Sequence, residues 1–383
     1  MTNSLGRPAT LGAREHDDGE AYAPSRPGWV VMLESQRQRW GGDLRRGQIF
    51  RRLAERTGAV VIGGFTPDAV RQALGPRWYV PLPLPSLGRG PRPRLASSDP
   101  LRPDVLWAVS RVADPVALAY YDDPVAQTAA LGIRLPRIRE RLLKAKRSVN
   151  LNLFRWHVVP SRSFAELVGL EPSRVIVAGN GTDTRHIQPG EWPLQPTIGM
   201  VSGAAPGRGI EGLVAAARLV RERVPELRLL LWLVATGPES AEFLASLRQS
   251  VAGERWINLG SVDYQDLGPA LSQASLLAIP HPPGDYMDVA LPVKLFDSMA
   301  AGRPVVVTPR AETRALVERH GVGLVARGDA PEDLADALLS VLEDPILGRR
   351  LGAAARSAAE REFDWAIVGD RVASTILERE GGS

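Results

Sequence analysis

The sequence contains no cysteine, so disulfide bridges and metal sites built from thiolates are both excluded. Its five histidines are scattered over 383 residues and show no spacing typical of metal ligands. No apolar run approaches the roughly 20 residues that a membrane-spanning helix requires. Residues 1–20 contain no apolar stretch of the kind found in signal peptides. From these absences we expect a cytoplasmic protein that binds no metal ion.

A strong excess of charge of one sign is also lacking. The 47 lysines and arginines against 43 aspartates and glutamates leave a net charge of only +4. This charge is too small to indicate a nucleic-acid partner, although it permits binding of anionic nucleotides or lipid headgroups. A hydrophobic content of 44% and a charged content of 23% are typical of a soluble globular protein. The length suggests two domains, preceded by a polar, disordered tail over residues 1–27.

The first ordered segment has the pattern of a strand, a helix and a second strand. The apolar run 29–33 predicts the first strand, residues 44–57 predict a helix, and residues 60–64 predict the second strand. Such a unit belongs to a parallel sheet, whose ligands bind at the carboxyl ends of the strands. Gly41 and Gly42 lie at that end of the first strand. They either let a substrate approach the backbone or form an ordinary tight turn.

Residues 80–103 are rich in proline and arginine and predict a long loop, which either faces an acceptor or is a solvated linker. Apolar runs predict strands over residues 105–109 and 116–121. Asp122 and Asp123 follow the second of these strands. A carboxylate pair at a strand end can supply a general base, and one of the two can instead cap the helix that follows.

Residues 134–155 carry eight basic side chains among isoleucine and leucine residues and predict a basic helix. Such a helix either lies against anionic lipid or lipid-phosphate acceptors at the inner face of a membrane, or is simply a solvated surface. Strands over residues 156–161 and 175–178 complete the first half of the chain.

Residues 288–308 predict an acidic loop, a short helix, a glycine that ends it, and a buried strand. Lys294 and Asp297 are three residues apart, so both lie on one face near the start of this helix. Unpaired backbone N–H groups at a helix start favour a phosphate, and the carboxylate can accept hydrogen bonds from sugar hydroxyls. Taken alone, an ordinary amphipathic helix with a solvated lysine explains the pattern equally well.

Residues 175–189 read Val-Ile-Val-Ala-Gly-Asn-Gly-Thr-Asp-Thr-Arg-His-Ile-Gln-Pro. This segment resembles the interdomain connection of family 4 glycosyltransferases. The strand and loop over 197–209, the elements that follow in order, the stretch at 288–308 and the Phe-Asp-Trp at 363–365 resemble the same family. The resemblance is close over residues 175–366 and looser over residues 29–174.

The resemblance implies an α/β protein of the GT-B fold, with two Rossmann-like, doubly wound parallel-sheet domains that face each other across a cleft. The alternation of strands and helices independently requires parallel sheets. We expect an acceptor-side domain over residues 28–190, completed by a C-terminal helix over 365–383. A nucleotide-sugar-binding domain is expected over residues 191–364.

Position by position, the resemblance implies a donor-binding set. It comprises Gly203, Arg208, Gly209, Leu291, Pro292, Lys294, Leu295 and Asp297. Arg208 stands where the family has a phosphate-binding lysine, and Asp297 stands where it has the ribose-binding acid. Two positions depart from the family: Ala204 replaces an arginine and Val289 replaces the first of two glutamates. Asp288, next to that valine, is a substitute candidate for the catalytic site.

The implied activity is that of a hexosyltransferase, which moves a sugar from a UDP- or GDP-linked donor to a hydroxyl of a glycan, lipid-linked or small-molecule acceptor. The nucleotide sugar is a substrate, so no cofactor is expected. The family implies metal independence and retention of configuration, with Asp122 or Asp123 as the base if the reaction inverts instead. Ala204 and Val289 keep open a non-catalytic protein that binds a nucleotide sugar or a partner transferase. A nucleotide-sugar epimerase of the same fold is a further alternative.

Overall fold

The computed structural model describes residues 28–33, 47–63, 92–111 and 113–381. Its strands form two sheets of six, and every pairing among these residues is parallel. The first sheet has the order β2-β1-β3-β4-β5-β6, and its strands are β1 (Trp29–Leu33), β2 (Val60–Gly63), β3 (Arg94–Ser97), β4 (Asp114–Ala119), β5 (Trp156–Val159) and β6 (Val175–Val177). The second has the order β12-β11-β10-β7-β8-β9, and its strands are β7 (Thr197–Gly203), β8 (Arg228–Val234), β9 (Ile257–Gly260), β10 (Leu276–Ile279), β11 (Val305–Val307) and β12 (Gly323–Val325).

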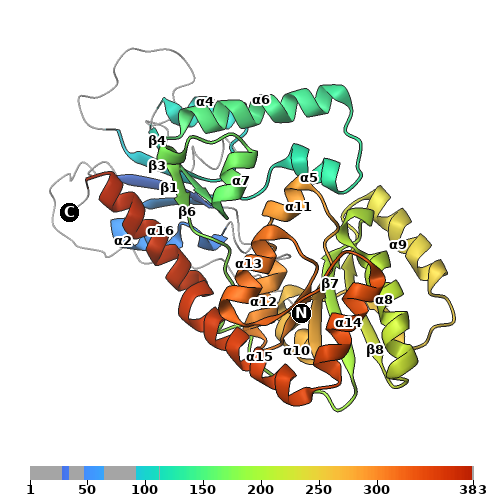
Figure 1. Cartoon of the computed structure of the whole chain (residues 1–383). Coiled ribbons are helices and arrows are strands. Elements are labelled where there is room, and N and C mark those ends of the chain that lie inside the picture. The colour runs from blue at the N-terminus through green and yellow to red at the C-terminus, as the bar shows by residue number, and fades with distance from the viewer. Residues whose placement is uncertain (1–27, 34–46, 64–91, 112, 382–383) are drawn as a thin grey trace, which may run out of the picture.

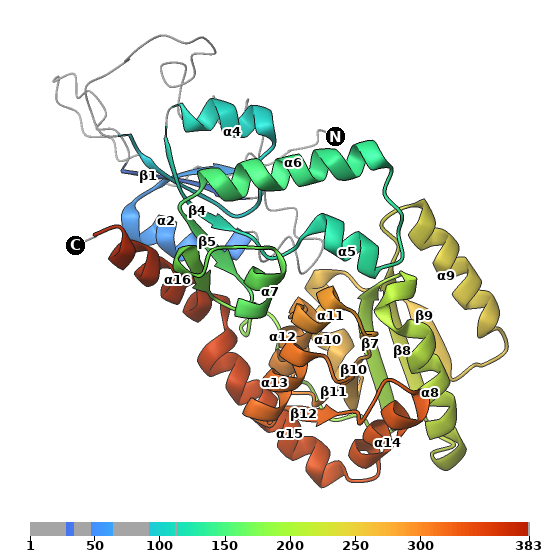
Figure 2. The same ribbon diagram turned by 45° about the horizontal axis from the view of Figure 1, so that its top comes forward.

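Helices cover both faces of each sheet (Figures 1 and 2). Those that follow strands of the first sheet are α2 (Arg51–Thr57), α4 (Pro103–Ser110), α5 (Pro124–Ala130), α6 (Arg137–Leu153) and α7 (Arg162–Leu167). The others are α8 (Ile210–Arg223), α9 (Pro238–Ser250), α10 (Leu267–Ser272), α11 (Asp285–Val289), α12 (Val293–Ala300), α13 (Ala311–His320), α14 (Pro331–Leu342), α15 (Pro345–Ala358) and α16 (Trp365–Arg379).

The alternation of side chains along β1 explains why the first sheet needs helices on both faces. Val30 and Met32 point into a core that they share with α4, α6 and α7, whereas Trp29 and Val31 point into a core with α2 and α16. All four side chains are buried. Because successive residues of a strand face opposite sides, a fully apolar strand is stable only between two covered faces.

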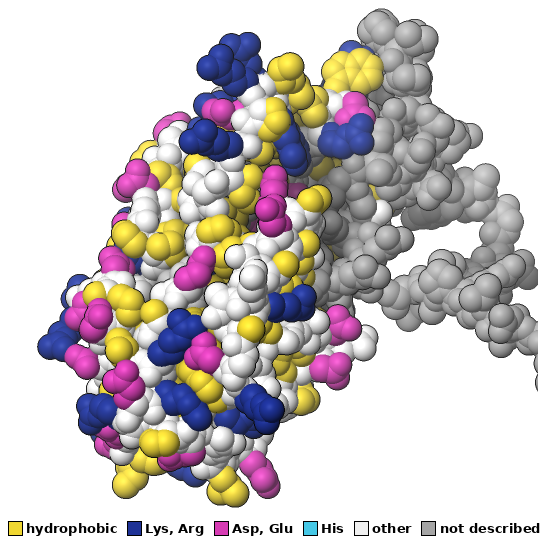
Figure 3. All heavy atoms as spheres, turned by 90° about the vertical axis from the view of Figure 1, so that its right-hand side faces the viewer, with side chains coloured by type: hydrophobic (Ala, Val, Ile, Leu, Met, Phe, Trp, Pro, Cys, Tyr) yellow, Lys and Arg dark blue, Asp and Glu magenta, His cyan; other side chains and the backbone are white. Residues whose placement is uncertain are grey.

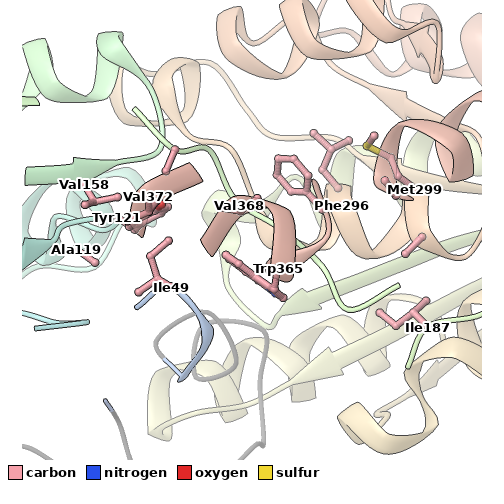
Figure 4. Packing of buried hydrophobic residues seen from close by; sticks show 14 of the residues in the cluster. Ile49, Ala119, Tyr121, Val158, Ile187, Phe296, Met299, Trp365, Val368 and Val372 are labelled. Atoms are coloured by element: carbon pink, nitrogen blue, oxygen red, sulfur yellow. The ribbon is translucent and has the colours of Figure 1, made fainter. Parts of the chain in front are cut away.

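One hydrophobic core continues from the first sheet to the second. The close-up in Figure 4 shows Ala119 and Val158 of the first sheet, Trp365 and Val372 of α16, and Met299 of α12 within this cluster. The helix α16 follows the second domain in sequence but packs against α2 of the first. Its burial therefore ties the two halves of the chain together.

The chain crosses between the halves at two points, and these points are bonded to each other. The N–H of Thr182 donates to the carbonyl of Phe363, and the N–H of Trp365 donates to the carbonyl of Thr182, each at 2.9 Å. Asp364 caps α16 and also accepts from the backbone N–H of Thr184 at 3.1 Å. The two crossovers thus form a single hydrogen-bonded junction.

Two secondary-structure predictions were wrong. The strand predicted over 105–109 is helix α4, because Pro103 occupies its first turn and Val105, Leu106 and Val109 bury one face. The loop predicted over 80–103 contains β3, which lies between β1 and β4 in the middle of the sheet. Its only apolar residues are Leu95 and Ala96, too short a run to stand out among its polar neighbours.

Two further expectations need adjustment. The stretch predicted as a loop from residue 288 begins inside helix α11 (Asp285–Val289), so Asp288 is helical. The helix predicted over 44–57 is present as α2, from Arg51, and residues 44–46 lie outside the described part of the chain. The remaining predicted strands are confirmed within a few residues at each end.

Candidate functional site

A cavity of about 350 Å³ lies between the two halves of the chain. The first half and the crossover contribute Tyr121, Asp122, Gln127, Phe164 and Asn180. The second half contributes Val201, Ser202, Gly203, Arg208, Val234, Thr236, Val262, Tyr264, Leu267, His281, Tyr286, Ala290, Leu291, Pro292, Val293, Lys294 and Asp297. The cavity stands at the carboxyl ends of β4 and β7, where parallel sheets bind ligands.

Two cations meet on the floor of this cavity. Lys294 lies in the first turn of α12, and its Nζ donates to the Ser202 hydroxyl at the end of β7, at 3.2 Å. The Nε of Arg208 is buried and has no hydrogen-bond partner among the described residues. Burial, followed by the charge of Arg208, lowers the pKa of Lys294 well below its usual value. An anion bound between the two would relieve both effects.

The first turn of α12 adds backbone donors to these cations. The helix begins after Pro292, whose extended conformation provides no side-chain cap. The N–H groups of Val293 and Lys294 have no carbonyl one turn earlier to bind, so they are available to a ligand. Leu295 and Phe296 hold the helix in place because both are completely buried in the core. Together, the two basic side chains and the helix start form a candidate binding site for a phosphate or diphosphate.

His281 follows β10 in the same region and is kept neutral. Its ring is buried, and neither nitrogen has a partner within the described residues. Burial lowers the pKa of His281 well below its usual value, and the charges of Lys294, Arg208 and Arg310 lower it further. At neutral pH His281 therefore adds no positive charge to this part of the cavity.

Asp297 lies one turn further along α12 and faces the crossover segment. Its Oδ1 accepts a hydrogen bond from the Thr182 hydroxyl at 2.8 Å, and the side chain is buried. Burial raises the pKa of Asp297 to about 7, against the effect of that hydrogen bond. The buried hydroxyl of Tyr264 lines the same part of the cavity and lacks a partner in the described chain. These groups can bind the hydroxyls of a ribose.

The two predicted glycines of the donor set have different roles. Gly203 lines the cavity, and a Cβ added there would meet nothing within 4 Å, so it leaves space for a ligand. Gly209 has a φ of +73°, and a Cβ there would stand 1.7 Å from the Pro280 carbonyl oxygen. Gly209 is required for the chain to turn into α8 and does not line the cavity.

The structure separates the three aspartates predicted as catalytic. Asp122 lines the cavity and accepts from the Tyr286 hydroxyl at 3.3 Å. Asp123 caps α5 through Oδ1 and binds the Tyr120 hydroxyl and Arg147 through Oδ2 at 2.7 and 2.9 Å. Its oxygens are fully engaged, and it does not line the cavity.

Asp288 lies away from the cavity and pairs with the buried Arg310 at 3.2 Å, which also binds Asp329. The proposal that a carboxylate acts as a base therefore rests on Asp122 alone.

Of the other predicted positions, some line the cavity and others do not. Leu291 and Pro292 line the cavity, whereas Leu295 is a core residue and does not. Ala204 is buried, and Val289 packs against the core beneath α7, so neither supplies a polar atom to a ligand. Gly41 and Gly42 lie outside the described residues.

Several cavity residues escaped the sequence reasoning. Tyr286, Gln127, Asn180 and Tyr264 line the cavity from four separate segments, and only folding brings them together. Thr182, two residues after Asn180, binds Asp297 of the cavity wall. Asn180 donates to the Leu291 carbonyl and so fixes the chain just before α12 against the crossover. Its place within the Asn-Gly motif was the one available signal.

The described residues include neither a metal-binding cluster nor a membrane-spanning helix. They contain no group of three or more acidic or histidine side chains arranged to hold a metal ion. None of their helices has both the length and the apolar character needed to cross a bilayer.

Part of the second half of the chain is similar to a family of known proteins. Residues 195–344 match the family model described as glycosyl transferases group 1, which confirms the resemblance recognised in the sequence. A GDP-mannose-dependent monoacylated alpha-(1-6)-phosphatidylinositol monomannoside mannosyltransferase of Corynebacterium glutamicum is 30% identical over 189 residues, or 48% of either chain. A phosphatidyl-myo-inositol mannosyltransferase of Mycobacterium tuberculosis is 29% identical over 182 residues, 46% of this chain and 45% of that one. The matches thus span about half the length of these relatives.

Solved structures confirm the fold over nearly the whole chain. Sucrose-phosphate synthase of Thermosynechococcus elongatus superposes with a TM-score of 0.68 and 17% identity, covering 93% of this chain and 100% of that one. The Anabaena protein HepE, solved with UDP and glucose, gives a TM-score of 0.64 and 15% identity, covering 91% and 98%. The predicted GT-B architecture of two parallel-sheet α/β domains is therefore confirmed.

Proposed function

We propose that this chain is a sugar transferase, because residues 195–344 match the family model of glycosyl transferases group 1 and the chain has a GT-B fold. It moves a hexose from a nucleotide-diphosphate sugar to a hydroxyl of a glycan, lipid-linked or small-molecule acceptor. The observation that carries the proposal is the pairing of Lys294 and Arg208 on the cavity floor beside the first turn of α12. A diphosphate is the ligand that this combination of charge and backbone donors suits best.

The chemistry follows from the position of those charges. As the bond between the anomeric carbon and the diphosphate breaks, negative charge grows on the leaving oxygens. Lys294, Arg208 and the N–H groups of α12 stabilise that charge, which lowers the barrier to the reaction. We propose that this cationic site replaces a metal ion, and that the departing phosphate accepts the acceptor's proton in a retaining reaction. If the reaction inverts, Asp122 is placed to act as the base.

The donor side of the proposal draws on the relatives. One is named as GDP-mannose-dependent and several are phosphatidyl-myo-inositol mannosyltransferases, so GDP-mannose is the first donor to test. The HepE structure holds UDP, so UDP-sugars are the second. An inositol-containing glycolipid is the first acceptor to test.

The surface of α6 supports an acceptor held at a membrane. Ile138, Leu142, Val149 and Leu153 repeat along one side of this helix and are 41–75% exposed. Arginines and lysines flank them in the sequence. Figure 3 views the molecule from the right-hand side of Figure 1, and it shows basic and hydrophobic side chains beside one another at its top, where the start of α6 faces the viewer. An exposed apolar stripe edged with cations suits an anionic bilayer. We propose that α6 rests on the inner face of the membrane while the cleft receives the lipid-linked acceptor.

Nucleotide release tests the main proposal. The purified protein is incubated with UDP-, GDP- and dTDP-sugars and candidate acceptors, with and without a chelator, and free nucleoside diphosphate is measured. Transfer that persists in chelator, with product configuration read by NMR, supports the metal-independent retaining reaction. If no nucleoside diphosphate or nucleotide sugar binds, the transferase and the epimerase are both excluded.

A second candidate is a non-catalytic protein of the same fold. Two observations favour it: Ala204 and Val289 supply no polar atoms where the family has an arginine and a glutamate. Tight binding of a nucleotide sugar without turnover, across the acceptor panel, would select this alternative.

A further inference from the structure

The proposed donor site lacks one group that a transferase needs. Its cations hold the diphosphate and Asp297 faces the ribose, but the transferred sugar also requires hydrogen-bonding partners. Val289, which stands where the family has an acid, packs into the core instead. The following inference rests on the proposed function and concerns what replaces that acid.

Three polar side chains from separate elements meet at one end of the cavity. The Tyr286 hydroxyl of α11 donates to Asp122 Oδ1, after β4, at 3.3 Å. Gln127 of α5 donates from Nε2 to the same hydroxyl at 3.4 Å. All three residues line the cavity, and Tyr286 is only 7% exposed. Each of these groups already has a partner, and the two hydrogen bonds are long, so a ligand hydroxyl binds by replacing or extending them.

Gly207, the neighbour of Arg208, lies against Ala130 and Leu131 at the end of α5, the helix that carries Gln127. Lys294 donates to Ser202 at the end of β7, and Asp297, one turn further along α12, accepts from Thr182 of the crossover. The order along the cavity is therefore the cluster, then Arg208 and Lys294, and then Asp297. A nucleotide sugar has the same order: sugar, diphosphate, ribose.

We infer that Tyr286, Asp122 and Gln127 form the recognition site for the hydroxyl groups of the transferred sugar, in place of the acid absent at position 289. Asp122 accepts hydrogen bonds, Gln127 offers both a donor and an acceptor, and Tyr286 can do either. Because Tyr286 belongs to the second half and the other two to the first, the site is complete only when the halves are together. A sugar bound there contacts both halves of the chain at once.

The competing explanation for this cluster is that its hydrogen bonds only hold the two halves together. Ligand affinities distinguish sugar recognition from such a structural role. The dissociation constants of GDP and GDP-mannose, and of UDP and UDP-glucose, are measured by calorimetry for the wild type and for Tyr286→Phe. We expect the variant to bind the sugar-free nucleotide within about twofold of the wild type and the nucleotide sugar about tenfold more weakly, the loss typical of one buried hydrogen bond.

A matched control is available in the same cavity. Tyr264→Phe removes a hydroxyl at the ribose end, and it should change the affinities of GDP and GDP-mannose by the same factor. In the wild type, donor analogues with single hydroxyls replaced by hydrogen should include one that binds about tenfold more weakly. That analogue should lose nothing further in Tyr286→Phe.

The outcomes are separable. If Tyr286→Phe weakens both ligands equally, or neither, the recognition site is wrong even though the transferase proposal stands. If the wild type binds no nucleotide at all, the proposed function fails and this inference fails with it. Thermal unfolding of each variant shows whether a loss of affinity reflects a loss of folded protein.

Discussion

The Lys294 ammonium lies 3.2 Å from the Ser202 hydroxyl, which joins the start of α12 to the end of β7 across the cavity. Arg208 lines the same cavity, and burial, followed by the charge of Arg208, lowers the pKa of Lys294. Bringing like charges together in a region of low dielectric costs free energy that a bound anion recovers. The preorganised repulsion between these side chains is therefore a source of affinity for a diphosphate.

Replacing Lys294 tests this source directly. We expect Lys294→Ala to weaken nucleoside diphosphate binding by about 10- to 100-fold, since a charged hydrogen bond to phosphate is lost. Calorimetric titration with GDP and UDP provides the measurement. Lys144→Ala is a suitable control because Lys144 is exposed and pairs with Glu140 on α6. Unchanged affinity in Lys294→Ala would show that the lysine does not bind the donor.

The protonation of Asp297 predicts how stability depends on pH. Burial raises its pKa in the folded protein to about 7, above the ordinary carboxyl value that applies when the chain is unfolded. Between those two values the folded state holds a proton that the unfolded state has released. The free energy of unfolding should therefore fall as the pH rises through this window and level off above about pH 7.

The variant Asp297→Asn isolates that effect because it cannot ionise and still accepts a hydrogen bond from Thr182. Unfolding midpoints measured from pH 4 to pH 8 without ligand should fall less in the variant than in the wild type. Parallel pH profiles for the two proteins would mean that Asp297 titrates at an ordinary carboxyl pKa.

The end of α16 is held to the first sheet by Glu380. This carboxylate is 4% exposed and accepts from Arg155 and from the indole of Trp156, at 2.7 and 2.8 Å. Glu380→Gln should lower the free energy of unfolding by about 1–3 kcal/mol, less than for a fully buried ion pair, since Arg155 is itself half exposed. Urea titration measures the change, and the exposed Glu378→Gln is the control.

Close approach of the two halves depends on Gly207. A Cβ at this position would stand 2.3 Å from the Ala130 carbonyl oxygen of α5 and 2.6 Å from the Leu131 Cα. Neither backbone atom can yield easily, so Gly207→Ala should separate the halves and weaken nucleotide-sugar binding. Small-angle scattering should report a larger radius of gyration.

Gly212→Ala on α8 is the matched control, because a Cβ there meets nothing within 4 Å. It should leave the radius of gyration unchanged. A Gly207→Ala protein as compact as this control would contradict the predicted separation.

The sequence was most informative where one segment carries the whole signal. The helix with Lys294 and Asp297 begins after Pro292 and ends before Gly302, and both limits were legible as residue types. Asp123 as the cap of α5 was likewise evident from the proline that follows it. The prediction from sequence was wrong at residues 105–109, which form part of helix α4. A short apolar run there suits either a strand or a buried helix face, and only packing against the neighbouring layer decides between them.

Residue order by itself determined the alternation that forces parallel sheets, the two-domain division of strands, and the position of Lys294 at the start of a helix. These features depend on local periodicity and on groups close together in the chain. Only the tertiary structure decided that Asp122 enters the cavity while Asp123 and Asp288 do not, and that Tyr286 and Gln127 meet Asp122. The hydrogen bonds of Tyr286 with Asp122 and Gln127 join segments more than 150 residues apart, and those of Asp123 with Arg147 and of Asp288 with Arg310 join segments more than 20 residues apart. No local pattern records such contacts.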